Sequence, residues 1–395
     1  SCEDISESTD PYRLEAQIGF VLRCVHQRAT EIFNTTMARH NVTPTQFAVL
    51  AKLADLGSVS QNQLGRLTAM DPATTSGVVG RLIESGVVRR ARGQVLSGDR
   101  LHLSHGPIDV VLRAWGETEA VKAAYAAAWS CFPRILPDLC DELAALRMPI
   151  TEAPRLTSPV ARRMYAACLP FADVFVTPMA AVAGAVADEL LARMRAVAPL
   201  TRAFVNDGGD IAVHVTEGAP LEIGIAGGFD TAAVPHLNGQ VRIAAGQGIG
   251  GLATSGARGR SFSLGIADAV TALAQDAATA DVAATLIANA VDGGQPHAQV
   301  TRRPASDLDP DTDLGTRLVT VAVGRLTHEE IAHALDAGCT RAERYRSQGL
   351  IQGASLMLQG HSRVAGNPAA VQLPEPALRP DDPHRTSISP TPGAP

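Results

Sequence analysis

The sequence predicts an α+β protein with a mostly helical N-terminal domain, a larger domain of mixed helices and strands, and a disordered tail. Apolar residues recur at helical spacing through the first part of the chain, and strand and helix patterns alternate through the second part. After residue 367 eight prolines fall among polar residues, so that segment cannot bury a core. We therefore predict domains at residues 11–92 and 93–362, followed by the tail at 363–395.

The N-terminal domain is predicted to contain helices followed by a strand. Apolar residues at every third or fourth position, from Leu14 to Phe33, form one stripe of a long first helix. Three shorter helices follow, and their capping residues are Thr43, Ser60 and Asp71. The last of them ends at Ser85–Gly86, and Val87–Arg92 is expected to be a strand. Helix, helix, short helix, helix and strand is the order of a winged helix-turn-helix.

The charge of the chain is unevenly distributed. Residues 11–92 carry ten Lys and Arg against five Asp and Glu, whereas the whole chain has a formal net charge of −6. A basic domain in an acidic chain suits a local contact with nucleic acid, because only the face that meets phosphates must be positive. The alternative is that this asymmetry has no function.

Residues 12–92 resemble the MarR family of transcriptional regulators. The resemblance rests on four runs of sequence: Thr43–Leu50, Ser60–Leu67, Asp71–Leu82 and Glu84–Arg90. It implies that the helix from Pro72 enters the major groove of double-stranded DNA and that the next strand leads to a wing. The expected DNA contacts are Thr74, Thr75, Ser76, Arg81, Arg89, Arg90 and Arg92. In the alternative interpretation, the hydroxyls only cap the helix and the arginines form a solvated face.

One departure from MarR proteins concerns dimerisation. In that family two long helices follow the wing and complete the dimer interface together with the first helix. Here the chain passes from Gly93 directly into Gln94–Ser104, and Ser97–Ser104 fits either a wing strand or the first strand of the next domain. We expect a homodimer, in which either the wing is short or the second domain supplies the dimer contact.

Strand and helix patterns continue through residues 93–362. Hairpins are expected about Gly106–Pro107 and about the turn Asn206–Asp210. Asp307–Asp313 lacks the glycine and the glutamate of a calcium loop, so we interpret it as an acidic turn. Further strands are expected at residues 221–225, 241–244, 267–273 and 317–323, and helices at 120–146, interrupted near Pro133 and Pro137, and at 179–195, 281–290 and 327–348.

The segment from residue 93 to about residue 360 resembles an uncharacterised branch of the ApbE-like superfamily. Its markers are Thr177–Glu189, Asn206–Asp210, Ala253–Gly256 and Thr279–Thr285. ApbE proteins bind FAD, and many use a magnesium ion to transfer FMN to a threonine of a target protein. The resemblance therefore implies a site for FAD or a related nucleotide, together with Mg²⁺.

The residue types in these markers suit such ligands. Paired glycines allow a positive φ and let backbone amides approach a ligand closely. Asp281 and Thr285 are four residues apart, so on a helix they share a face and offer oxygen atoms to a hard cation. The alternative is a hairpin turn and a capped helix without a ligand. The expected cofactor-binding residues are Gly184, Asp188, Asn206, Asp207, Gly208, Gly209, Asp210, Thr254 and Ser255, and the expected metal ligands are Asp281 and Thr285.

Two departures from the family concern catalysis. Family members carry a Lys at the position of Ala183, and a His in the segment that is Arg258–Leu264 here. Without that His, a general base for a target threonine is missing. We therefore favour a transcriptional regulator whose second domain senses a flavin, a nucleotide or a related molecule. The alternatives are an ApbE-type flavin transferase with an appended winged helix, and an assembly module with neither activity.

The cysteines and the hydropathy bear on location. No C-x-x-C pair and no His at zinc spacing accompanies the cysteines, which are Cys2, Cys24, Cys131, Cys140, Cys168 and Cys339. We interpret them as reduced thiols of a cytoplasmic protein. No run of about 18 consecutive apolar residues occurs, so no contact with a membrane is expected.

Overall fold

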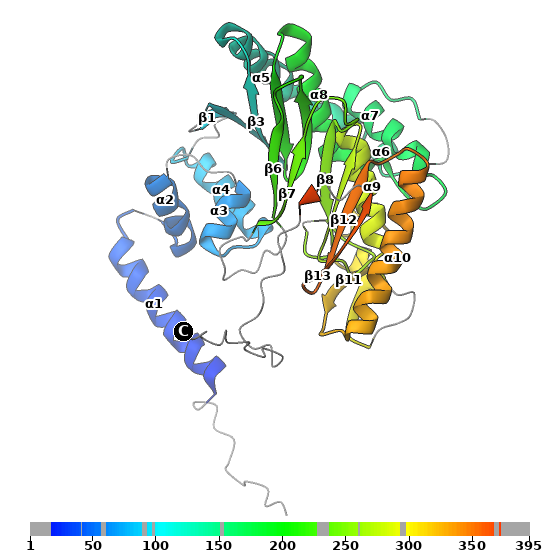
Figure 1. Ribbon diagram of the computed structural model, residues 1–395. Coiled ribbons are helices and arrows are strands. Elements are labelled where there is room, and N and C mark those ends of the chain that lie inside the picture. Colours follow the sequence, from blue (N-terminus) through cyan, green and yellow to red (C-terminus); the bar gives the residue numbers. More distant parts are fainter. Residues whose placement is uncertain are drawn as a thin grey trace, which may run out of the picture. The chain divides into compact units, whose positions relative to one another are not determined.

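The computed structural model describes residues 17–40, 42–56, 61–88, 93–96, 99–150, 154–226, 237–259, 261–292, 298–366 and 371–372 (Figure 1). The chain divides into two compact units, Ser1–Ala91 and Arg92–Pro395. The first unit is helical where it is described, and the second combines helices and sheets, so the predicted α+β class is confirmed. No helix in the described ranges is long and apolar enough to traverse a bilayer.

The first unit folds around the predicted helical segments: α1 (Ile18–Met37), α2 (Pro44–Leu56), α3 (Gln61–Thr68) and α4 (Pro72–Glu84). Its core is built from Val49 of α2, Leu64 of α3, and Val78 and Leu82 of α4. The predicted cap of α4 is confirmed, because the Asp71 carboxylate accepts a hydrogen bond of 2.8 Å from the N–H of Thr74.

Helix α1 exposes the apolar stripe that the sequence predicts. The exposed fractions of Ile18, Leu22 and Val25 are 79%, 62% and 60%. Near the other end of the helix, Phe33 packs against Phe47 of α2, with 5.5 Å between ring centroids. No residue of α1 is buried, so most of the stripe has no partner within the described part of the first unit.

The strand predicted over Val87–Arg92 is wrong where the structure describes it. Val87 and Val88 form a bend, and the N–H groups of both donate to the carbonyl oxygen of Leu82 at 3.1 Å. Their donors are thus used to close the C-terminus of α4 rather than to pair with a strand. The remainder of this prediction, residues 89–92, lies outside the described residues.

The second unit is built on a nine-stranded sheet in which every neighbouring pair of strands is antiparallel. Both predicted hairpins are confirmed as pairs of adjacent strands. In spatial order the strands are β1 (Gly93–Leu96), β2 (Arg100–His105), β3 (Ile108–Trp115), β4 (Arg202–Asp207), β5 (Asp210–Val215), β8 (Gly251–Ser255), β9 (Ala269–Ala274), β12 (Gly353–Leu358) and β13 (His361–Gly366).

The edge strands of this sheet lie near the two ends of the predicted second domain. Strand β2 pairs with β1 on one side and with β3 on the other, so the described part of Ser97–Ser104 belongs to the sheet of the second unit. The predicted boundary at residue 362 falls inside β13, which pairs with β12 as far as Gly366. Residues 367–370 and 373–395 of the predicted tail lie outside the described residues.

Helices cover one face of the sheet. The predicted interruption at Pro133 and Pro137 is wrong, because α5 continues through both prolines and keeps Phe132, Ile135 and Leu139 buried in the core. The helices are α5 (Thr118–Asp141), α6 (Leu143–Leu146), α7 (Pro159–Cys168), α8 (Val182–Val197), α9 (Ala277–Ala290) and α10 (His328–Ser347), with 3-10 turns at Leu169–Phe171, Pro178–Ala181 and Ala305–Asp307.

Alternation along the strands creates a core on each face. In β4, Val205 belongs to the large core under the helices, whereas Phe204 packs against a smaller core on the other face. The smaller core includes residues of a three-stranded sheet formed by β6 (Leu221–Ala226), β7 (Leu237–Ile243) and β14 (Val371–Gln372). The remaining strands, β10 (Val300–Pro304) and β11 (Leu318–Val323), pair with each other.

Helices α8 and α9 approach each other closely at their N-termini. A Cβ atom on Gly184 would lie 2.3 Å from the carbonyl oxygen of Ala277 and 2.7 Å from the Cα of Ala278. Real Cβ atoms do not tolerate such distances to backbone atoms, so this crossing requires glycine at position 184.

Replacing Gly184 should therefore separate the two helices. We predict that Gly184→Ala lowers the unfolding free energy of the second unit by about 1–3 kcal/mol, the usual cost of overpacking, in denaturant titrations followed by tryptophan fluorescence. The matched control is Gly80→Ala in α4, where a Cβ meets nothing within 4 Å. Because alanine favours helices, thermal unfolding by circular dichroism should show no loss of stability in that variant. An equally stable Gly184→Ala variant would contradict the packing argument.

Candidate functional site

Helices α8 and α9 are joined by carboxylates, each of which accepts hydrogen bonds from N–H groups in the first turn of the other helix. Asp188 of α8 accepts hydrogen bonds from the N–H groups of Ala277 at 3.1 Å and Ala278 at 2.9 Å. Asp281 of α9 accepts one from the N–H of Gly184 at 3.1 Å. N–H groups in the first turn of a helix lack partners within the helix, and its N-terminus favours negative charge. Each helix therefore supplies the anion that satisfies the other.

This arrangement changes the interpretation of two predicted ligand residues. Gly184 makes the close crossing possible, and both oxygens of the Asp188 carboxylate are used by α9. Burial, and then the neighbouring Asp276, raise the pKa of Asp188 to about 6 against the opposing effect of the two N–H bonds. We therefore infer that Gly184 and Asp188 hold α8 and α9 together and do not contact a cofactor.

The turn Asn206–Asp210 joins β4 to β5 at one edge of the site. Gly208 and Gly209 have φ angles of 68° and 124°, which favour glycine. The N–H of Gly209 donates to the Asn206 side chain at 2.9 Å. The structure thus confirms a tight hairpin turn with two glycines at its tip.

The strand alternation places the predicted ligand residues on opposite faces of the sheet. Asp207 and Asp210 lie on the helix-covered face, where both carboxylates act electrostatically on Asp281 of α9. Asn206 lies on the other face, on which Phe204 packs against the smaller core, and it lines a pocket there. A motif that is contiguous in sequence therefore serves two separate places, because successive side chains in a strand point in opposite directions.

Hydroxyl residues of β8, β9 and α9 lie near the β4–β5 turn. The Thr254 N–H donates to Asp210 at 3.3 Å, and the Thr254 hydroxyl lies 2.8 Å from that of Thr271. On the helix side, the Thr285 hydroxyl donates to Ser255 at 3.4 Å. The structure thus places Ser255 and Thr285 together on the side that carries Asp281. The Thr254 hydroxyl lies on the other face of the sheet, because Thr254 alternates with Ala253 and Ser255 along β8.

The electrostatics around Asp281 favour a cation. Burial, followed by the carboxylates of Asp210 and Asp207, raises the pKa of Asp281 well above its usual range. A bound cation would relieve this repulsion, and carboxylate and hydroxyl oxygens are donors that suit Mg²⁺. In the described ranges no group of three or more His, Cys, Asp and Glu forms a metal centre. A cation at this place would therefore take most of its ligands from water or from a bound ligand, as Mg²⁺ usually does.

Sequence reasoning missed a polar pair beside the turn. His102 lies 2.5 Å from the Asp109 carboxylate, and the N–H of Asp109 donates to Asp207 at 3.4 Å. The two residues lie on β2 and β3 and come together only through the hairpin register, in which Ser104 is opposite Asp109. The predicted hairpin about Gly106–Pro107 was therefore the only sequence signal that could have indicated this pair. A similar long-range contact joins the acidic turn to the site region, where the Thr177 hydroxyl donates to Asp313.

The segment in which the family would carry a His is used structurally. Arg258 forms an ion pair of 2.8 Å with Asp268, and the N–H of Leu264 donates to Asn289 at 2.9 Å. Ser263 is buried. The described residues of Arg258–Leu264 therefore supply no general base.

Helix α4 presents part of the predicted DNA-contact set to solvent. Thr74, Ser76 and Arg81 are exposed. A Cβ on Gly77 would lie 3.6 Å from a terminal nitrogen of Arg81, so this guanidinium folds back along the helix toward its N-terminal half. Arg89, Arg90 and Arg92 lie outside the described residues.

Thr75 is the exception in this set. Its side chain is 1% exposed, and its hydroxyl donates to the carbonyl oxygen of Asp71 at 2.8 Å. A Cβ on Gly65 of α3 would lie 2.9 Å from the same hydroxyl. Thr75 therefore packs α4 against α3, and we correct its role from DNA contact to the packing of the helix-turn-helix.

Comparison with family models divides the chain in two. Residues 92–364 match the model described as AbpE bacteria, and residues 40–95 match the model described as MarR family. Both matches include residues 92–95, most of which form β1.

Related sequences show the same division. A UPF0280 protein of Methanopyrus kandleri is 38% identical over 143 residues, which are 36% of this chain and 54% of that protein. One from Methanothrix thermoacetophila is 39% identical over 145 residues, 36% of this chain and 55% of the relative. The HTH-type transcriptional repressor NicR of Pseudomonas putida is 42% identical over 72 residues, 18% of this chain and 46% of NicR. The chain thus spans about half the length of these relatives.

Two solved structures are also similar. A probable transcriptional regulator from Pseudomonas aeruginosa has 44% sequence identity and a TM-score of 0.20, over 24% of this chain and 70% of that chain. The apo form of the flavinyl transferase ApbE from Pseudomonas stutzeri has 12% identity and a TM-score of 0.39, over 70% of this chain and 96% of the other.

The raised pKa of Asp188 leads to a prediction about pH. A carboxyl whose pKa is higher in the fold than the usual 3.8 stabilises the fold at low pH, and this contribution is lost as the pH rises through about 6. Asp188→Asn does not titrate and keeps one acceptor oxygen. The wild type should therefore lose up to about 3 kcal/mol of unfolding free energy, relative to this variant, as the pH rises from about 4 to about 7.5.

Urea unfolding followed by tryptophan fluorescence measures this difference, because Trp115 and Trp129 both lie in the second unit. Asp311→Asn, in the exposed acidic turn, controls for the loss of one negative charge. A difference that stays constant or shrinks as the pH rises would contradict the assignment of Asp188.

Proposed function

The chain belongs to the family described as AbpE bacteria, and we propose that it is a DNA-binding transcriptional regulator whose ApbE-like unit binds a flavin or a related nucleotide. The observation that carries this proposal is the fusion itself. An exposed helix of MarR type at residues 72–84 precedes, in one chain, a unit whose acidic cluster suits a metal-assisted phosphate ligand. Because β1 follows α4 closely in the chain, ligand binding in the second unit can bias DNA binding by the first.

The DNA-binding part of the proposal rests on α4. Its buried side carries Thr75, Val78 and Leu82, so the opposite side, with Ser76 and Arg81, faces solvent. A groove-reading helix needs such a side, with short polar groups near its N-terminus and a cation within reach of phosphates or base edges. Arg89, Arg90 and Arg92 stay in the proposed contact set as residues of the adjoining wing. DNA binding of this kind implies a cytoplasmic protein.

A homodimer is part of the same proposal. The exposed stripe of α1, which includes Ile18, Leu22, Val25 and Ile32, is too apolar to remain in water along its whole length. A second copy of α1 is the partner that the MarR resemblance implies. Two copies would also present two α4 helices to the half-sites of one operator.

The ligand site is proposed around Asp281. Asp281 and Thr285 would hold a magnesium ion, and Asp207, Asp210 and Ser255 would surround the bound ligand. When bound, the cation would supply positive charge for a pyrophosphate. The chain's own contribution is to fix the Asp281 carboxylate through Gly184 and to keep the site within the helix-covered face.

We propose that the second unit binds a flavin or related nucleotide and does not transfer FMN to a target protein. Ala183 stands where the family carries a Lys, and the described residues of Arg258–Leu264 are committed to structural contacts. No observation here favours the flavin transferase over the regulator.

The first test concerns DNA. The full chain should bind double-stranded DNA from the region upstream of its own gene, with an affinity that falls steeply as salt rises. Arg81→Ala should weaken this binding at least about tenfold, the effect of losing one good base or phosphate contact per subunit. Fluorescence anisotropy measures both effects, and Arg134→Ala, an exposed arginine of α5, is the control of equal charge. Absence of salt-sensitive binding by the wild type would refute the regulator proposal.

The second test concerns FAD. We predict that the full chain binds FAD and that Mg²⁺ strengthens the binding, as measured by isothermal titration calorimetry. Asp281→Asn keeps an acceptor for the Gly184 N–H but loses the charge, so it should abolish the magnesium effect. Thr285→Val should reduce it, whereas Asp311→Asn should not change it. Equal effects of Mg²⁺ on the wild type and on Asp281→Asn would exclude this metal site.

A further inference from the structure

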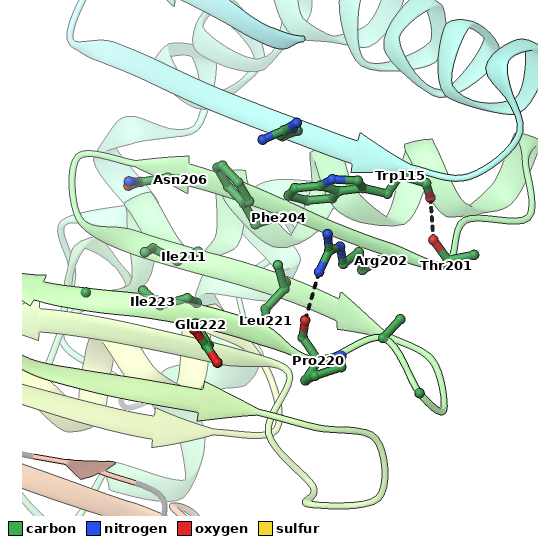
Figure 2. Close-up of a pocket in the computed structure, with 14 residues that line it drawn as sticks. Trp115, Thr201, Arg202, Phe204, Asn206, Ile211, Pro220, Leu221, Glu222 and Ile223 are labelled. Carbon is green, nitrogen blue, oxygen red and sulfur yellow. Dashed lines mark hydrogen bonds between the residues drawn. The ribbon is translucent and has the colours of Figure 1, made fainter. Parts of the chain in front are cut away.

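A pocket of about 1020 Å³ lies on the face of the large sheet that the helices do not cover. Figure 2 shows its two walls. Phe204 and Ile211 come from β4 and β5 of the large sheet, and Leu221 and Ile223 come from β6 of the three-stranded sheet. These side chains pack against the smaller core, and their remaining surface forms the apolar lining of the pocket, which we call the slot.

Two arginines bring positive charge into this slot. The guanidinium carbons of Arg113 and Arg202 lie 4.5 Å and 4.4 Å from the centroid of the Trp115 ring. A guanidinium held over an aromatic ring keeps its N–H donors for other partners. Trp115 therefore orients both groups without neutralising them.

The donors of these arginines are largely unused within the described residues. Arg202 donates to the carbonyl oxygen of Pro220 at 3.0 Å, and both residues line the pocket (Figure 2). The Nε of Arg113 is buried and has no hydrogen-bond partner in the described part of the chain. A buried donor without a partner is costly, and a ligand oxygen would satisfy it.

Among the described residues that line the pocket, Glu222 is the one acidic residue. Glu222 is exposed, and its carboxylate lies 4.0 Å from Arg242. Neither Arg113 nor Arg202 forms an ion pair with a described carboxylate at a salt-bridge distance. The slot therefore combines apolar walls with an excess of positive charge, which is the reverse of the acidic cluster around Asp281 on the other face.

We infer that this pocket binds a planar aromatic anion, a ring that carries a carboxylate or a phosphate. The ring would lie against the apolar lining formed by Phe204, Ile211, Leu221 and Ile223. The anionic group would accept hydrogen bonds from Arg113 and Arg202, and the Asn206 amide, which lines the same pocket, is available to a polar ring substituent. This site goes beyond the proposed flavin site and does not depend on it, because the two lie on opposite faces of the sheet.

The test uses 2-naphthoate as the probe and the full chain with Trp129→Phe. Trp129 lies on α5 with an exposed fraction of 45%, and the chain has two tryptophans, so this variant leaves Trp115 as the reporter. Naphthoate should change the Trp115 emission saturably. The matched neutral and non-planar probes, naphthalene-2-methanol and cyclohexanecarboxylate, should bind at least about tenfold more weakly.

Two substitutions at the pocket and one control substitution, in the same background, locate the site. Arg113→Met should weaken naphthoate binding at least about tenfold, whereas Arg134→Met should leave it unchanged. Glu222→Gln should tighten binding about threefold, a gain that misfolding cannot produce. Absence of a saturable signal up to about 10 mM, where even fragment-sized ligands bind, would overturn the inference. So would equal affinity for naphthalene-2-methanol.

The result separates this inference from the proposed function. Asp281→Asn should leave naphthoate binding intact while it abolishes the magnesium effect on FAD. Naphthoate binding without FAD binding would refute the flavin site alone, and the reverse would refute the pocket alone.

Discussion

The close crossing of α8 and α9 is the constraint on which the second unit depends. Gly184 lets the two helix N-termini approach until backbone meets backbone, and the exchanged carboxylates of Asp188 and Asp281 satisfy N–H groups that the helices cannot satisfy themselves. Because Asp281 is fixed in this way, its carboxyl group is held near Asp207 and Asp210 at the β4–β5 turn, and burial together with these two carboxylates raises its pKa. The packing of α8 and α9 thus brings carboxylates together, and a bound cation would reduce the repulsion between them.

The two faces of the large sheet carry opposite chemistry. On the helix-covered face, carboxylates and hydroxyls gather around Asp281, and burial makes their repulsion strong. On the other face, Trp115 holds Arg113 and Arg202 above a second, smaller core. Strand alternation alone accounts for this division, since Asn206 and Asp207 are neighbours in sequence and belong to different faces.

Local signals predicted much of the fold. The predicted caps at Thr43 and Asp71 marked helix starts that the structure reproduces. Strand β12 was missed because its residues are almost all buried, so it lacks the alternation that identifies a strand. At the site, residue types could be predicted, but the partners of Asp188 are about ninety positions away. No local pattern reports that a carboxylate is used by a distant helix, and the Trp115 pocket likewise joins strands far apart in sequence.

The central claim is that the fold positions Asp281 to hold a cation beside a phosphate ligand. Crystals of the full chain grown with FAD and Mn²⁺, examined by anomalous diffraction at the manganese edge, test this claim most directly. We expect one anomalous peak at about 2.1 Å from a carboxylate oxygen of Asp281, as for Mg²⁺, with Thr285 close by and a phosphate oxygen of FAD on the same ion. Density for bound FAD without a peak at Asp281, or a manganese peak elsewhere in the unit, would contradict it.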